Sequence, residues 1–227
     1  MTVLRRILLV VPILLFAGAV VALLAPGGLG DSRPQVVTEG LSAEAYRGTV
    51  GRAGELPGWL HALAEYGAAG GLFVLAGLLA RVGWLGWRRH RVPGAFGVLL
   101  VGAGTVLAYL VSEGLKLVVD QERPCRALVD VGTWVSCPAV GDWSFPSNHS
   151  TVAGGLAAGL VLLAPRLWYL AVPVAGAVAA LRVVAGVHYP HDVLAGLLLG
   201  AAASAALLIA LRPAPVSAAA RQPAPHH

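Results

Sequence analysis

The sequence predicts an all-α integral membrane protein, a bundle of six transmembrane helices, from two observations. The first is composition: 57% of the 227 residues are hydrophobic and only 12% are charged, with a mean hydropathy of +0.76. Soluble domains carry about 25% charged residues, so this chain has too few charges to cover a globular surface. The second is the gathering of apolar residues into segments close to the roughly 20 residues that cross a hydrocarbon core, which disfavours a very apolar soluble protein.

Each apolar segment is expected to be a helix, because backbone N–H and C=O groups in lipid must pair within their own segment. The spacings Gly155-x-x-x-Gly159 and Gly196-x-x-x-Gly200 are typical of helices that pack closely. The expected helices lie at 6–25, 62–83, 94–119, 148–165, 167–188 and 192–212.

These helices divide the chain into four parts. Residues 1–25 are the first transmembrane helix; a cleaved signal peptide is the alternative, although the apolar run is longer than a usual signal core. Residues 26–58 predict an extracytoplasmic loop with a short interfacial helix. Residues 59–212 hold the other five helices, and the Ala- and Pro-rich residues 213–227 predict a disordered cytoplasmic tail.

Orientation in the membrane is predicted from the basic residues. Arg81, Arg88, Arg89 and Arg91 cluster around one short connection, which the positive-inside rule assigns to the cytoplasm. Both chain ends then lie in the cytoplasm, and the loop between the third and fourth helices lies outside. We therefore expect a multi-pass cell-membrane protein of the cell envelope. The net charge of +5 sets topology in this interpretation, so no nucleic-acid partner is expected, and oligomeric state is left open.

Both cysteines of the chain, Cys125 and Cys137, fall in that outer loop. The extracytoplasmic compartment is oxidising, which predicts a disulfide between them; two free thiols are the alternative. The bond would close a loop of about a dozen residues and order the chain after Arg123 and Pro124.

Three short motifs place ionisable residues at the ends of apolar helices, where such groups usually serve a site. In the first, Lys116 and Arg123 are seven residues apart and share a face if the third helix runs as far as Pro124. Two cations at a helix C-terminus can bind an anion, with snorkelling to the interface as the alternative. Glu113 is expected to pair with Lys116 or Arg182, or to approach a substrate headgroup.

The second motif is Pro146-Ser147-Asn148-His149. Ser147 is predicted to be the N-cap of the fourth helix, and the N–H groups that follow are a ready anion site. His149 would face the bound group from the first turn. A merely polar helix terminus is the alternative for this histidine taken alone.

The third motif is Arg182…His188…Asp192. An unpaired charge such as Arg182 inside an apolar helix costs about 2.5–3.5 kcal/mol on insertion scales. Asp192 can accept the Nδ1 proton of His188 across the helix corner, which leaves Nε2 free to attack an electrophile. His191 lies in the same corner and is assigned a local structural role.

In this order and spacing, Lys-x6-Arg-Pro, Pro-Ser-x-His and Arg-x5-His-x3-Asp resemble the type 2 phosphatidic acid phosphatase superfamily, over residues 60 to 212. The resemblance implies a six-helix membrane fold, an active site at the extracytoplasmic face and no metal or other cofactor. It implies that His188 is a nucleophile that forms a phosphohistidine and that Asp192 orients it. His149 would be the general acid and then the base. The implied phosphate-binding groups are Lys116, Arg123, Arg182, Ser147 and the Asn148 backbone.

The chain departs from the family pattern twice. Asn148 stands where the family usually has glycine, and we expect a special backbone angle there, which asparagine tolerates next best. Leu181 stands where the family usually has serine before the motif arginine, so one phosphate hydrogen bond is either missing or supplied by another residue. Neither departure removes a residue needed for the chemistry.

These features predict a hydrolase of phosphoric monoesters or diphosphates that acts on a membrane lipid. An outward site in a chain that is nearly all membrane favours conversion of a polyprenyl pyrophosphate to the polyprenyl phosphate. A phosphatidic acid or phosphatidylglycerol phosphate phosphatase and a lipid phosphotransferase are alternatives. A lipid-anion transporter without enzymatic activity is disfavoured, because holding phosphate requires cations but not an Asp-oriented histidine. The expected partners are this lipid substrate and other membrane lipids.

Overall fold

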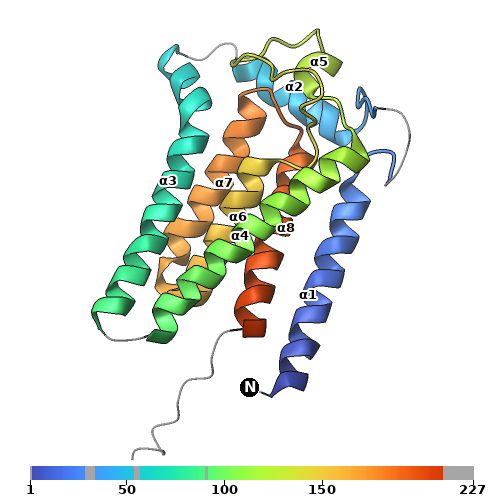
Figure 1. The fold of residues 1–227 in the computed structure, drawn as a ribbon. Coiled ribbons are helices and arrows are strands. Elements are labelled where there is room, and N and C mark those ends of the chain that lie inside the picture. Colours follow the sequence, from blue (N-terminus) through green and yellow to red (C-terminus); the bar gives the residue numbers. More distant parts are fainter. Residues whose placement is uncertain (1, 29–33, 54–56, 90–91, 212–227) are drawn as a thin grey trace, which may run out of the picture.

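The computed structural model describes residues 2–28, 34–53, 57–89 and 92–211, and these are helical apart from their connections. The longer helices form an upright bundle, and the short helices α2 and α5 lie across one end of it (Figure 1). No strand occurs among the described residues. The helices are α1 Val3–Leu24, α2 Leu41–Ala53, α3 Trp59–Arg88, α4 Val92–Val119, α5 Pro124–Ala127, α6 Asn148–Leu163, α7 Trp168–Val184 and α8 Pro190–Leu211. A short 3-10 turn at Pro165–Leu167 precedes α7.

Five stretches are long and apolar enough to cross a membrane: α1, α3, Ala95–Val119 of α4, Pro165–Val184 and α8. The fourth expected span is the shorter helix α6, which has 16 residues. Nine of those residues are buried, so α6 is enclosed by its neighbours along most of its length. A complete crossing by a sixth helix therefore stays a prediction.

The centre of the bundle is the contact between α6 and α8, where glycines replace larger side chains. A Cβ on Gly200 would overlap the Thr151 carbonyl oxygen, and one on Gly196 would lie 2.5 Å from the Ser147 oxygen. The two backbones therefore touch directly, as small residues allow. This contact brings Asp192, in the first turn of α8, against the start of α6, where Ser147 N donates to the Asp192 carbonyl oxygen at 3.1 Å.

The helix that carries Lys116 ends at residue 119, as the sequence predicts, whereas α7 ends four residues before the predicted residue 188. The helix α4 stops at Val119, so Arg123 is not part of it. Asp120 has φ 45°, the left-handed conformation that ends helices, and Pro124 begins α5 because its missing N–H is tolerated there. Likewise α7 stops at Val184, since Gly186, with φ 83°, turns the chain before the third motif's histidine.

The ends of the described chain lie together, opposite the motifs (Figure 1). Arg6 Nη1, near the start of α1, donates to the carbonyl oxygen of Ala210, near the end of α8, at 2.6 Å. The expected tail at 213–227 lies outside the described residues, as does Arg91 of the basic cluster.

Helix α2, within the predicted loop 26–58, packs over the corner between α7 and α8. Tyr46 is fully buried, and its hydroxyl donates to the Gly186 carbonyl oxygen at 3.0 Å. Tyr189 packs against the Tyr46 ring at 5.6 Å between centroids and donates to the Val37 carbonyl oxygen at 2.5 Å. The corner that precedes α8 is thus tied to α2 and its leading segment.

Candidate active site

The three motifs meet at one cavity of about 280 Å³ at the end of the bundle that carries α2 and α5. It lies between α3, α4, α6, α7 and the segment that connects α5 to α6. Six residues of the predicted site line it: Lys116, Arg123, Asn148, His149, Arg182 and His188. The other lining residues are Leu72, Tyr109, Pro138, Asp142 and Val152.

His188 lies at the wall of this cavity with its two ring nitrogens in different surroundings. Nε2 is 3.2 Å from Arg123 Nη1, and an arginine can only donate, so Nε2 carries the lone pair and Nδ1 the proton. Nδ1 faces Asp192 Oδ2 at 3.4 Å. Burial, aided by the charges of Arg123 and Arg182 and opposed by Asp192, lowers the pKa of His188 to about 3. The imidazole is therefore neutral at physiological pH.

Asp192 is fully buried behind His188, and Ser144 joins the two. The Oδ2 atom accepts from Ser144 Oγ at 2.5 Å and from Tyr189 N at 2.8 Å. Ser144 Oγ also lies 3.4 Å from His188 Nδ1. Ser144 was not among the predicted site residues; its signal is a small polar residue two positions before Pro146, in a segment without periodicity.

His191 lies on the far side of Asp192 and does not line the cavity. Its Nδ1 is 2.6 Å from Ser42 Oγ of α2, and its Nε2 is 3.0 Å from both Gln121 Oε1 and Asp192 Oδ1. These contacts agree with the local structural role predicted for it. They also continue the attachment of α2 to the corner that carries His188.

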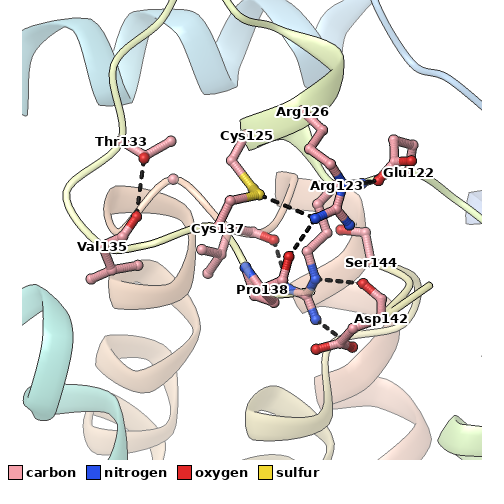
Figure 2. The surroundings of a disulfide bond; sticks show 12 residues. Glu122, Arg123, Cys125, Arg126, Thr133, Val135, Cys137, Pro138, Asp142 and Ser144 are labelled. Carbon is pink, nitrogen blue, oxygen red and sulfur yellow. Dashed lines mark hydrogen bonds and ion pairs between the residues drawn. A yellow bond between two sulfur atoms is a disulfide. The ribbon is translucent and has the colours of Figure 1, made fainter. Parts of the chain in front are cut away.

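The Arg123 guanidinium is almost fully engaged by the protein and is buried. Nε donates to the Asp142 carbonyl oxygen at 2.7 Å and Nη2 to Asp142 Oδ1 at 2.8 Å (Figure 2). Nη1 donates to the Val187 carbonyl oxygen at 3.0 Å. The side chain is thereby fixed in one plane, with the His188 ring at one corner and the Asp142 carboxylate at another.

Asp142 brings together the two cations of the first motif, which no single helix aligns. Its Oδ1 is also 3.6 Å from Lys116 Nζ. Burial raises the pKa of the Asp142 carboxyl, but the hydrogen bond from Arg123 and the charges of Arg123 and Lys116 outweigh it and hold this pKa below its usual value. Asp142 was not among the predicted site residues either; the available signal is one acidic residue four positions before Pro146.

Glu113 pairs with Lys116, one of the partners predicted for it, at 3.0 Å between Oε1 and Nζ. The same oxygen accepts from Asn148 Nδ2 at 2.6 Å, and Ser112 Oγ donates to Asn148 Oδ1 at 2.7 Å. Asn148 is therefore a side-chain link between α4 and α6.

The prediction of a special backbone angle at Asn148 is wrong. Asn148 is the first residue of α6, and among the described residues only Asp120 combines a side chain with a positive φ. An asparagine fits there because its amide finds partners on α4, so the reason is packing and hydrogen bonding rather than backbone strain.

Ser147 holds the predicted N-cap position of α6, but its side chain makes no capping hydrogen bond and does not line the cavity. Its hydroxyl accepts from Ser150 Oγ at 3.3 Å, and the residue is fully buried. The cause is the close contact with α8, which takes its backbone N–H as well. The structure therefore does not bring the Ser147 side chain to the expected phosphate site.

Arg182 lines the cavity and keeps an unused donor. Its Nε is buried and has no hydrogen-bond partner within the described parts of the chain. Buried donors are normally paired, so an unpaired one at a cavity wall favours an anionic ligand. Leu181, beside it, packs against α3 at Gly67 and offers no hydroxyl in its place.

A disulfide anchors the chain shortly before Asp142. Cys125 and Cys137 are joined, with their Cα atoms 5.9 Å apart. Arg126 holds the same segment through donations to the carbonyl oxygens of Pro138 and, at 3.3 Å, of Ala139, and pairs with Glu122 (Figure 2). The loop is therefore attached to α5 by a covalent bond and by a fixed arginine.

Within the described residues, no group of three or more His, Cys, Asp or Glu side chains is placed to hold a metal ion. The cavity instead carries Lys116, Arg123 and Arg182 against the single lining carboxylate of Asp142. This arrangement suits an anion; a reaction without metal stays a prediction.

Residues 97–214 match the family model of the PAP2 superfamily. The match spans more than half of the sequence, and the chain belongs to this superfamily. A solved structure, the transmembrane PAP2 type phosphatidylglycerolphosphate phosphatase from Bacillus subtilis, shares the fold with a TM-score of 0.55 and 22% identity. The likeness covers 87% of this chain and 93% of that one. With its apolar helices, the protein is a multi-pass membrane protein.

Curated relatives match a little under half of the chain. An undecaprenyl-diphosphatase from Sulfolobus acidocaldarius is 38% identical over 42% of this chain and 46% of its own. A decaprenylphosphoryl-5-phosphoribose phosphatase from Mycobacterium tuberculosis is 36% identical over 47% and 57%. A lipid A 1-phosphatase from Rhizobium johnstonii is 37% identical over 42% and 40%. The chain spans about half the length of these relatives.

Proposed function

We propose that this chain hydrolyses the phosphate or pyrophosphate group of a membrane lipid through a phosphohistidine on His188. The observation that carries the proposal is the 3.2 Å contact between His188 Nε2 and Arg123 Nη1. It puts the lone pair of a neutral imidazole at the wall of a cavity lined by three cations. A nucleophile beside an anion-binding group is what phosphoryl transfer requires.

In the first step, the phosphoryl oxygens bind Lys116, Arg123 and Arg182, and Nε2 of His188 is released from Arg123 to attack phosphorus. The new N–P bond forms as the bond between phosphorus and the leaving oxygen breaks. His149, on the same cavity, gives its proton to that oxygen. The cations spread the charge of the transferring group, which is the main catalytic demand.

In the second step, His149 takes a proton from water, and the oxygen attacks phosphorus as the N–P bond breaks. Inorganic phosphate leaves, and Nε2 regains its lone pair. Asp192 and Ser144 keep the proton on His188 Nδ1 throughout and stabilise the charge of the phosphorylated ring. This division of roles is supported by the burial of Asp192, which has no place for a substrate beside it.

A lipid substrate is supported by the apolar part of the cavity wall. Leu72 of α3, Tyr109 of α4 and Val152 of α6 line it together with the cations. Two of the relatives are named as phosphatases of polyprenyl compounds, which favours a polyprenyl pyrophosphate as the substrate of this chain. The alternative substrates are phosphatidic acid and phosphatidylglycerol phosphate, and the alternative reaction is transfer of the phosphoryl group to an acceptor other than water. A panel of substrates and acceptors separates these alternatives.

The cavity is proposed to face the extracytoplasmic side. It lies at the end of the bundle opposite the start of α1 and the end of α8. Arg88, at the C-terminal end of α3, lies at that opposite end, which the positive-inside rule assigns to the cytoplasm.

The test is release of phosphate from a polyprenyl pyrophosphate by the full chain purified in detergent, with excess chelator present. We expect release that persists in chelator and is abolished in His188→Ala, because the variant has no nucleophile. Release that survives in the variant would contradict the role of His188. Loss of release on adding chelator would contradict a reaction without metal.

A further inference from the structure

Asp142 is a carboxylate inside a site that is otherwise built for an anion. Its Oδ1 lies 2.8 Å from Arg123 Nη2 and 3.6 Å from Lys116 Nζ, and the residue lines the same cavity as His149, Arg182 and His188. A phosphoryl group attacked by His188 would need the same two cations. The mechanism proposed above has no step for this carboxylate.

The loop presents Asp142 in a defined place. The Asp142 backbone N–H donates to the Ala139 carbonyl oxygen at 3.1 Å in a turn that contains Gly141 at φ 86°. Arg126 and the disulfide hold the chain before this turn, and Ser144 N donates to the Gln121 carbonyl oxygen at 2.8 Å after it. The carboxylate is nevertheless about half exposed, so it can leave the cations without unfolding the loop.

The balance of charges in the cavity favours a role for the Asp142 carboxylate in phosphate binding. Lys116, Arg123 and Arg182 contribute three positive charges, and Asp142 and Glu113 each neutralise one through the ion pairs described above. Three uncompensated cations would bind phosphate strongly in every state, including the product. Uniform binding does not accelerate a reaction, and product release often limits turnover.

We propose that the Asp142 carboxylate competes with phosphate for Arg123 and Lys116, holding both cations when the site is empty and returning to them when the product leaves. Asp142 is then a residue that sets phosphate affinity. The idea rests on the proposed function only for the identity of the anion, which is inorganic phosphate as the product.

The test compares binding of inorganic phosphate to the full chain and its variants in detergent, by titration calorimetry and by inhibition of lipid phosphate hydrolysis. Asp142→Asn removes the charge but keeps the Oδ1 acceptor for Arg123. We expect it to bind phosphate about tenfold more tightly than the unaltered chain, because one charge a few ångströms away changes such equilibria by that factor or more. Asp130→Asn is the matched control: Asp130 lies on the same connection, pairs with Arg47 at 3.5 Å and is mostly exposed.

Equal or weaker phosphate binding by Asp142→Asn would overturn the proposal and leave Asp142 as a support for Arg123. A second variant covers the case in which Asp142→Asn misfolds. In Asp142→Ala, added acetate should occupy the vacated place and weaken phosphate binding, with no such effect in the unaltered chain; absence of this competition overturns the proposal too. Because binding is measured directly, a chain that binds phosphate but hydrolyses no lipid contradicts the proposed function alone.

Discussion

The assignment of His188 Nε2 as the proposed attacking atom depends on one contact. Sequence spacing alone allowed Asp192 to orient the ring, and the structure places Asp192 Oδ2 3.4 Å from Nδ1. The spacing could not show that Arg123 contacts the other nitrogen, because that contact joins residues 65 positions apart. Nor could it show Ser144, whose place depends on how an irregular loop folds back on α8.

The pH dependence of stability tests the buried, neutral state of His188. Its pKa falls from 6.5 to about 3 on folding, so the unfolded chain binds more protons between these values and stability is lost as pH falls. Between pH 6 and pH 4 this histidine alone should lower the free energy of unfolding by about 2–3 kcal/mol. The measurement is the thermal unfolding midpoint in detergent at both pH values.

His188→Gln is the comparison, because glutamine does not titrate. We expect its unfolding midpoint to fall less between pH 6 and pH 4 than that of the unaltered chain. An equal fall in both proteins would mean that other groups cause it and that His188 is not held neutral by burial.

At the scale of elements, helix α2 holds the corner that positions His188. Two of its side chains contact this corner: Tyr46 contacts Gly186, and Ser42 contacts His191. The segment before α2 contacts Tyr189. The sequence predicted a helix in this loop, but its contacts were not predictable, because neither partner segment has a periodic pattern. The same limit applies to Arg123, whose place beyond the end of α4 depends on the left-handed Asp120.

Tyr46→Phe tests this attachment. Burial and the nearby Asp130 raise the pKa of Tyr46 to about 12, so its hydroxyl stays protonated and donates to Gly186. The variant keeps the ring and leaves a buried carbonyl oxygen unpaired, at a cost of about 1 kcal/mol. We expect kcat to fall about fivefold with KM little changed, because the cations are untouched.

Tyr66→Phe is the control for that variant, since Tyr66 is 66% exposed on α3 and lies outside the cavity lining. A Tyr46→Phe protein whose KM rises while kcat holds would contradict a role in positioning His188. Steady-state kinetics on one lipid phosphate at a fixed detergent concentration separate the two results.

For the whole molecule, packing between α6 and α8 determines whether the motifs meet. The small-residue spacing of Gly196 and Gly200 predicted a close helix contact, and the structure places that contact at the bundle centre. The partner helix could not be read from the spacing, because Gly-x-x-x-Gly specifies closeness but not a partner. Six motif residues were brought to one cavity as predicted, whereas Ser147 was drawn into this contact instead.

Gly200→Ala tests this packing. The added Cβ would overlap the Thr151 carbonyl oxygen and approach Gly155 N at 2.7 Å, so α6 and α8 must separate. Overpacking of this kind costs about 1–3 kcal/mol. We expect a lower thermal unfolding midpoint together with a loss of phosphatase activity, since His149 and Asp192 lie on the two separated helices.

Gly102→Ala is the matched control, because a Cβ at Gly102 of α4 meets nothing within 4 Å. It should unfold at or above the temperature of the unaltered chain. An unchanged midpoint in Gly200→Ala would contradict this packing, because it would show that α6 and α8 can lie at the wider distance of ordinary helix pairs without loss of stability.

The closed loop after α4 also bears on the order in which the site is assembled. Lys116, Arg123 and Asp142 come from one continuous stretch that the disulfide fastens, whereas Arg182 and His188 arrive with later helices. A ribosome therefore completes the stretch that holds these two cations and their carboxylate before it adds the proposed nucleophile. Until α7 and α8 insert, those cations already have an internal counter-ion, and the growing chain need not expose them unpaired to lipid headgroups.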